Sequence, residues 1–205
     1  MTEPKLRILV ADDERNIRKN LALVLEAAGY WVDEAKDGDE ALELCKNDHP
    51  DIAFIDLHMP KLQGLDVLAH IRALSPKTAV VIITAYGSAA NAVQAMKLGA
   101  VEFLEKPFDP KVVGLLAEEI LFRRRLGAGV SFDDLMHLAE LARERKANIE
   151  ARGYLKTAMS VALDRPQPYY WLVLCARMKA TKSARFSITI WRSPRIILMR
   201  PRPPR

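Results

Sequence analysis

The sequence predicts an α/β fold built around a parallel β-sheet. Short, continuously apolar runs, typical of buried parallel strands, alternate along the chain with segments whose apolar residues recur at helical spacing. Such alternation indicates βαβ units. Four such runs, a further strand-like segment and five helical segments fill roughly the first 125 residues. The expected strands are residues 6–11, 30–35, 52–55, 79–83 and 101–104.

Five helices are expected in the same part of the chain. The first, over residues 16–28, has its apolar residues on one face and is stopped by Gly29. The others are expected over residues 38–46, 64–73, 87–98 and 109–124. Each of the first four joins two consecutive strands, as a parallel sheet requires.

A smaller helical region is expected after a linker at residues 127–130, where two glycines lie close together. Ser131 is placed to cap a helix that begins at Phe132. A second helix is expected over residues 149–163, with Pro166 and Pro168 ending it. Both helices have alanine-rich apolar faces, so the pair resembles one unit of an α-helical repeat.

The charge is unevenly distributed. Residues 172–205 contain nine Lys and Arg and no acid, which leaves 22 of the 31 basic residues against 26 acids in residues 1–171, a net charge of −4. The body of the protein is therefore not expected to bind nucleic acid. No apolar run approaches the length of a membrane span, and the two cysteines have neither metal-ligand nor disulfide-scaffold spacing. A cytoplasmic protein with no membrane contact is expected.

Polar groups follow four of the expected strands. Asp12 and Asp13 follow the first, Asp56 the third, Thr84 the fourth and Lys106 the fifth. Ligands of α/β proteins bind at the carboxyl ends of such strands. Three carboxylates brought together there predict a Mg²⁺ site completed by a phosphate, with Lys106 and Thr84 contacting the phosphate. A carboxylate among such partners can act as a nucleophile and form an acyl phosphate.

Residues 6–124 resemble the receiver domain of two-component response regulators. The motifs ILVADDE, IAFIDLHMP, VVIITAYGS and VEFLEKPF carry the resemblance, in this order. It implies a doubly wound, flavodoxin-like five-stranded sheet of order 2-1-3-4-5 with helices on both faces, in a receiver domain over residues 1–126. It also implies a phosphorelay in which Asp56 accepts a phosphoryl group from a histidine kinase or phosphotransfer protein. Mg²⁺ would be held by Asp12, Asp13, Asp56 and the backbone carbonyl of His58.

The resemblance implies further roles around this site. Thr84 and Lys106 would contact the phosphoryl oxygens, and the Lys106–Pro107 peptide would be cis. Movement of the Thr84 hydroxyl would be coupled to rotation of the Phe103 ring, which would reshape the surface of the fourth helix and fifth strand. The alternative is that Phe103 is simply a core residue. His58 and Tyr86 would flank the route of hydrolytic water and tune phosphoryl lifetime.

Residues 131–171 resemble a tetratricopeptide-type helical pair, through the sequence LAELARERKANIEARGYLKTAMSVALDRPQPYY. The alternative is a plain helical extension of the receiver. From about Leu172 acids vanish and Arg, Pro and Ile become frequent. This basic tail, residues 172–205, could be an arm for nucleic acid or membrane surfaces. We favour a frameshifted read of a second repeat. When the third base of each codon is joined to the first two bases of the next, residues 177–195 are compatible with DEGDKERALQYYNLALAPD.

The favoured function is that of a phosphorylation-controlled signalling protein whose helical segment binds a downstream protein, with phosphorylation-dependent dimerisation as a further expectation. A DNA-binding transcriptional response regulator that uses the basic tail is the alternative. A phosphohydrolase is the third possibility, although the sequence shows no separate substrate pocket. We expect no enzymatic activity beyond self-catalysed phosphoryl transfer and dephosphorylation.

Overall fold

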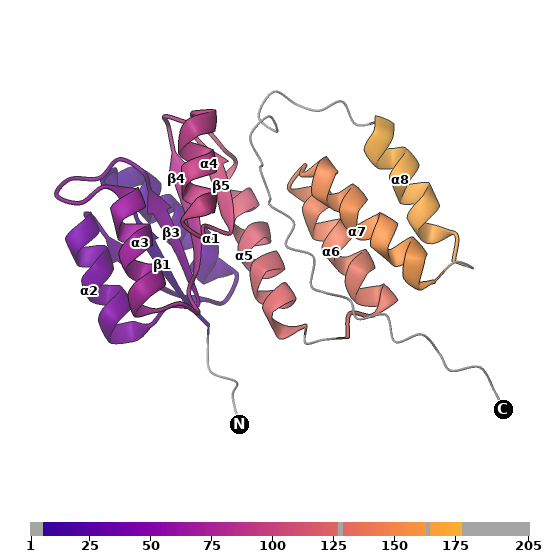
Figure 1. Ribbon diagram of the computed structural model, residues 1–205, viewed down its shortest axis with the longest axis horizontal. Helices are drawn as coiled ribbons and strands as arrows, with labels where there is room; N and C mark the ends of the chain where they lie inside the picture. The colour runs from indigo at the N-terminus through magenta and orange to yellow at the C-terminus, as the bar shows by residue number, and fades with distance from the viewer. Residues whose placement is uncertain (1–5, 127–128, 163–164, 178–205) are drawn as a thin grey trace.

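The computed structural model describes residues 6–126, 129–162 and 165–177. Its sheet has five parallel strands in the order β2-β1-β3-β4-β5 (Figure 1). The doubly wound fold and the strand order expected from the sequence are confirmed. The strands are β1 (Arg7–Ala11), β2 (Trp31–Ala35), β3 (Ile52–Asp56), β4 (Ala79–Thr84) and β5 (Glu102–Glu105).

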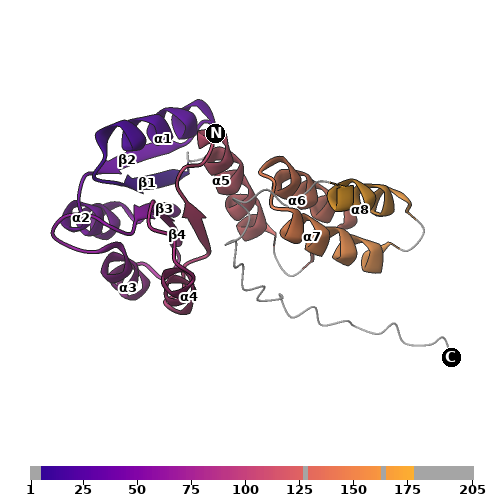
Figure 2. The same cartoon turned by 90° about the horizontal axis from the view of Figure 1, so that it is seen from above.

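Helices cover both faces of the sheet (Figure 2). One face packs against α2 (Gly38–Asp48), α3 (Gly64–Leu74) and α4 (Ala89–Lys97). The other packs against α1 (Arg15–Ala27) and α5 (Pro110–Arg125). Because side chains alternate along a strand, Leu9 and Ile55 enter the first core while Ile8 and Phe54 enter the second.

Side chains that cap the helices explain where several of them begin. Asp37, Ser88 and Asp109 accept hydrogen bonds from backbone N–H groups in the first turns of α2, α4 and α5. The expected helix 87–98 is shorter in the structure because Ser88 is the cap of α4 and lies outside the helix.

Three further helices form a helical module after the linker: α6 (Phe132–Glu144), α7 (Asn148–Val161) and α8 (Gln167–Arg177). They share a core of their own, which contains alanines from α6 and α7 and Cys175 from α8. Ser131 caps α6 with a capping box in which Asp134 is the second partner. The first two helices were expected from the sequence.

The third helix, α8, was not expected. The sequence pattern places the end of the helical segment at residue 171 and the start of the tail at residue 172, yet α8 continues across this boundary. The helix α7 ends at Val161, before Pro166 and Pro168, as expected. Pro168 also lies in the first turn of α8, where a backbone N–H has no partner within the helix. The tail beyond residue 177 lies outside the described residues.

A buried charge cluster joins the receiver part to the helical module. Arg145, at the end of α6, pairs with Glu119 of α5 at 2.8 Å, with Glu102 of β5 at 3.8 Å and with Glu150 of α7. Tyr154 of α7 donates a hydrogen bond to Glu119 at 2.7 Å. All five side chains are buried. Burial, followed by the charge of Glu119, raises the pKa of Tyr154, so its hydroxyl keeps its proton at neutral pH.

None of the helices in the described part of the chain is both long enough and apolar enough to cross a membrane.

Candidate functional site

The residues predicted from the strand ends lie together at one edge of the sheet. Asp12 follows β1, Asp56 is the last residue of β3, and these two strands pair directly. One ligand oxygen from each of Asp12, Asp13 and Asp56 lies within 4.8 Å of the others. Asp12 and Asp56 are buried and Asp13 is exposed. The carboxylate cluster is thus present, with one member facing solvent.

Lys106 reaches this cluster from the end of β5. Its Nζ lies 2.7 Å from Asp12 Oδ2 and 3.1 Å from Asp56 Oδ2. Glu14 is more distant, at 3.6 Å. The Lys106–Pro107 peptide is cis, as the resemblance implied. The ammonium group therefore lies within contact distance of two of the three carboxylates predicted as metal ligands.

The electrostatics of the site favour an additional cation. Burial raises the pKa of Asp12, and the hydrogen bond from Lys106 lowers it by less, so the net pKa lies above the ordinary value. Burial lowers the pKa of Lys106, but its contacts with Asp12 and Asp56 raise it by more. The ammonium of Lys106 thus does not fully offset the burial of Asp12. Clustered carboxylate oxygens are the donors that Mg²⁺ prefers, so the residues present fit this ion.

Thr84 ends β4 with its side chain fully buried. Its Oγ1 accepts a hydrogen bond from the backbone N–H of Tyr86 at 3.0 Å. The Tyr86 and His58 rings meet edge to face, with centroids 5.1 Å apart. Tyr86 is 71% exposed, so this ring pair forms part of the rim at the surface. The predicted neighbours of the access route therefore lie together, while their effect on phosphoryl lifetime stays a prediction.

Phe103 is buried on β5, in the core that α2, α3 and α4 share with the sheet. The buried position does not decide between the two interpretations, switch and core, and the rotation of the ring stays a prediction. Its backbone N–H donates to Oε1 of Glu102 at 3.1 Å. Glu102 in turn pairs with Arg145, so Phe103 is two contacts away from the helical module.

Gly64 is a site residue that no sequence pattern singled out. A Cβ atom at this position would lie 2.2 Å from the backbone oxygen of Asp56. Only glycine lets the start of α3 approach β3 so closely. The available signal was a glycine at the first position of an expected helix, where it has no advantage in helix propensity.

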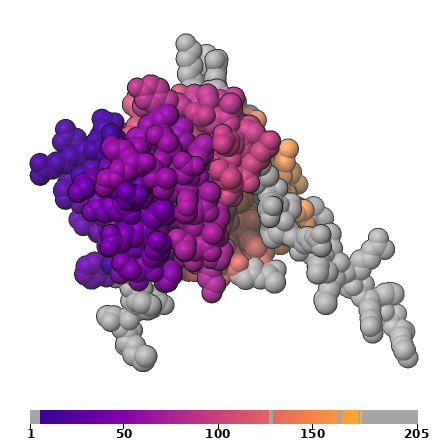
Figure 3. All heavy atoms as spheres, turned by 60° about the vertical axis from the view of Figure 1, so that its left-hand side comes forward, coloured from indigo at the N-terminus to yellow at the C-terminus, as the bar shows by residue number. Residues whose placement is uncertain are grey.

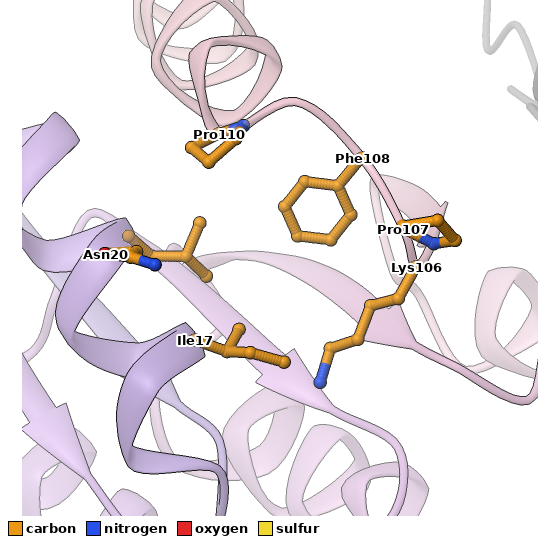
Figure 4. A pocket seen from close by; sticks show the side chains of 7 residues that line it. Ile17, Asn20, Lys106, Pro107, Phe108 and Pro110 are labelled. Atoms are coloured by element: carbon orange, nitrogen blue, oxygen red, sulfur yellow. The ribbon is translucent and has the colours of Figure 1, made fainter.

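A pocket of about 240 Å³ opens beside Lys106, between α1 and the loop that follows β5. Ile17 on α1 and Phe108 on the loop face each other across it, and the Lys106 side chain points away from the loop along its edge (Figure 4). Asn20 is the one uncharged polar residue among those that line it. The surface next to the carboxylates is therefore largely apolar.

The profile of the response regulator receiver domain matches residues 8–116, which is more than half of the chain. The chain belongs to the response regulator receiver family. A solved receiver domain from Clostridium thermocellum is 35% identical, with a TM-score of 0.55, over 58% of this chain and 97% of that one. The receiver domain of the putative response regulator NarL from Mycobacterium tuberculosis is 34% identical, with a TM-score of 0.53, over 56% and 94%.

Curated relatives match the same family. A probable transcriptional regulator, ycf27, from Guillardia theta is 38% identical over 126 residues, 62% of this chain and 49% of that protein. The regulatory protein AtoC of Escherichia coli K12 is 35% identical over 115 residues, 56% of this chain and 25% of its own length. This chain thus spans about half of the first relative and a quarter of the second.

Proposed function

We propose that this protein is a response regulator of a two-component phosphorelay, in which Asp56 accepts a phosphoryl group from a phosphohistidine of a histidine kinase or phosphotransfer protein. The observation that carries the proposal is the contact of Lys106 with Asp12 and Asp56, beside the exposed Asp13. Together these residues provide a nucleophile, a cation site and a positive charge for a phosphate.

The transfer needs little from the protein beyond positioning and charge. A carboxylate oxygen of Asp56 forms a bond to phosphorus while the phosphorus–nitrogen bond of the phosphohistidine breaks, and the imidazole nitrogen keeps the electron pair. Mg²⁺, held by Asp12, Asp13, Asp56 and the His58 carbonyl, would neutralise charge on the phosphoryl oxygens. Lys106 and Thr84 are placed to contact those oxygens afterwards. No turnover of a separate substrate is proposed.

The apolar pocket beside Lys106 supports a protein phosphodonor. A phosphohistidine that reaches Asp56 must bring its own helix across the rim of the site. Ile17 and Phe108 give that rim an apolar surface on which such a helix can pack (Figure 4). Tyr86 and His58 form another part of the rim.

We further propose that the helical module, a tetratricopeptide-like unit, is the output and binds a downstream protein. The space-filling view shows the receiver part in front, with the orange module behind it at one side (Figure 3). Rotation of Phe103, coupled to Thr84, would act on the module through Glu102 and Arg145, which form a continuous set of contacts.

We place the protein in the cytoplasm, because both of its cysteines are unpaired and buried. The identity of the target and phosphorylation-dependent dimerisation stay predictions.

Removing divalent metal tests this function directly. Incubation with acetyl phosphate and Mg²⁺ is expected to add one phosphoryl group to the chain, and excess EDTA is expected to prevent it, because the clustered carboxylates repel the incoming phosphate without the cation. Intact-protein mass spectrometry measures the addition. Equal labelling with and without EDTA would remove Mg²⁺ from the mechanism.

Replacing Lys106 by alanine separates metal binding from switching. The Lys106→Ala protein is expected to bind Mg²⁺, since the three carboxylates remain, but phosphorylation should no longer change the surface of α4 and β5. Hydrogen exchange of these two elements, with and without phosphorylation, measures the effect. Lys111→Ala, which removes an exposed lysine at the start of α5, is the control and should respond like the wild type. An unchanged surface on phosphorylation in the wild type as well would contradict the switch.

The alternative of a DNA-binding regulator depends on residues 172–205. Of these, residues 172–177 complete α8 and the rest lie outside the described part. Basic residues alone would give DNA binding that is independent of sequence and lost steeply as salt rises. A salt titration with specific and random duplexes discriminates: tight, sequence-selective binding would favour the alternative over protein output.

A further inference from the structure

The last described helix, α8, has an apolar outer face. Its inner face contributes Cys175, Trp171 and Leu172 to the core of the helical module. On the opposite side, Tyr169, Tyr170 and Val173 are 47%, 65% and 51% exposed. Residues spaced this way lie on one side of a helix, and two aromatic rings and a branched aliphatic side chain are an unusual choice for a solvated face.

The inward-facing positions of α8 repeat those of α6. In both helices they recur with the same spacing, and corresponding residues are 33 positions apart. The pairs are Leu135 with Pro168, Leu138 with Trp171, Ala139 with Leu172, and Ala142 with Cys175. Tetratricopeptide-type helical pairs repeat with a period of about 34 residues. The pattern of α8 is therefore that of the first helix of a second pair.

The first pair shows what should follow such a helix. Lys146 directly follows Arg145, the C-cap residue of α6, and has a φ of 64°. The backbone N–H of Lys146 donates to the Arg143 carbonyl at 3.0 Å, and that of Ala147 donates to the Ala142 carbonyl at 2.8 Å. This is a Schellman turn, in which glycine is the favoured residue at the left-handed position. The helix α7 then buries Ala151, Leu155 and Ala158 completely.

A glycine for the turn and small or aromatic residues at the buried positions of the next helix appear 33 codons later, when the codons are read one base out of frame. The codons of Lys179 and Ala180, which correspond to Lys146, can then specify only glycine or serine. The codons of Trp191 and Arg192, which correspond to Ala158, can specify only alanine or glutamate. The compatible string DEGDKERALQYYNLALAPD has glycine at the turn, followed at the places of Ala151, Leu155 and Ala158 by alanine, tyrosine and alanine.

We propose that the outer face of α8, formed by Tyr169, Tyr170 and Val173, is the docking surface for the second helix of a second tetratricopeptide-type pair, and that this helix is encoded in the shifted frame of the DNA for residues 177–195. The inference rests on the proposed repeat-type output but not on the phosphoryl chemistry. An amphipathic helix with alanines at close-contact positions fits beside the Tyr and Val side chains, as α7 fits against α6. The second pair extends the concave surface on which such repeats bind their partners.

The coding DNA gives the first test. Sequencing codons 165–205 from independent isolates is expected to reveal a one-base difference that joins the two frames near codon 177. An unchanged frame in every isolate would overturn the proposal.

Hydrogen exchange of α8 gives the second test, in two full-length proteins. One is the chain as printed, and the other carries DEGDKERALQYYNLALAPD directly after Arg177, as a single added base would produce. In the second protein the α8 amides are expected to exchange about tenfold more slowly, because a packed helix must open before they exchange. Val173→Asp should abolish this protection there and change little in the chain as printed. A third protein with the same 19 residues in scrambled order should exchange like the printed chain.

Equal exchange of α8 in the restored and scrambled proteins would overturn the docking surface. Phosphoryl uptake from acetyl phosphate is measured in the same samples. Phosphoryl uptake without protection of α8 would rule out the second pair and leave the phosphoacceptor function intact. Protection of α8 without phosphoryl uptake would rule out the phosphoacceptor function and leave the second pair intact.

Discussion

Replacing Asp56 by asparagine is expected to abolish phosphoryl uptake from acetyl phosphate and from any histidine kinase. The amide is nearly the same size as the carboxylate, so it should fit between β3 and α3 and leave the fold intact. It lacks the negative oxygen that attacks phosphorus. Asp12 is not expected to substitute, since Lys106 and the Glu14 backbone hold its two carboxylate oxygens at 2.7 and 2.9 Å, closer than the 3.1 and 3.5 Å of the corresponding contacts of Asp56. Intact-protein mass spectrometry after incubation with phosphodonor and Mg²⁺ measures the loss.

The control for Asp56→Asn is Asp66→Asn, which makes the same chemical change at an exposed position in the first turn of α3. This variant should take up phosphoryl groups at the wild-type level. Circular dichroism and the urea midpoint of both variants establish that the fold is retained. Labelling that persists in Asp56→Asn would place the acceptor on another residue and remove the central role of β3.

The receiver part was predictable because one physical constraint acts on many residues at once. The three strands at the centre of the sheet, β1, β3 and β4, are buried and almost continuously apolar, so they stand out as runs, and their polar ends lie at the same sheet edge. Asp12, Asp56, Thr84 and Lys106 could therefore be placed together from the sequence alone. Gly64 could not, because its role depends on how closely α3 approaches Asp56 in space.

The link between the two parts of the protein could not be predicted for a similar reason. Glu102, Glu119 and Arg145 come from three elements and have no spacing pattern in the sequence. Charged residues are mostly solvated, so each is expected at the surface. Only the packing of α6 against α5 shows that they meet in a buried cluster. Likewise, proline both ends helices and occupies their first turns, and this ambiguity at Pro168 hid α8.

Replacing Arg145 by methionine is expected to destabilise the helical module by about 3–5 kcal/mol, the usual cost of removing one member of a buried ion pair. Methionine keeps much of the apolar volume, so the loss should come from Glu102, Glu119 and Glu150, which share this arginine. Urea unfolding followed by circular dichroism measures this loss of stability.

The control is Lys156→Met, which removes the same charge from an exposed position of α7 and should change the stability by less than about 0.5 kcal/mol. Adding Glu119→Gln and Glu150→Gln to Arg145→Met should recover part of the loss, because two of the three buried carboxylates that shared Arg145 are then neutral. A cost for Arg145→Met no larger than that for Lys156→Met would mean that the cluster does not hold the module, and the proposed route from Phe103 to the output would fail with it.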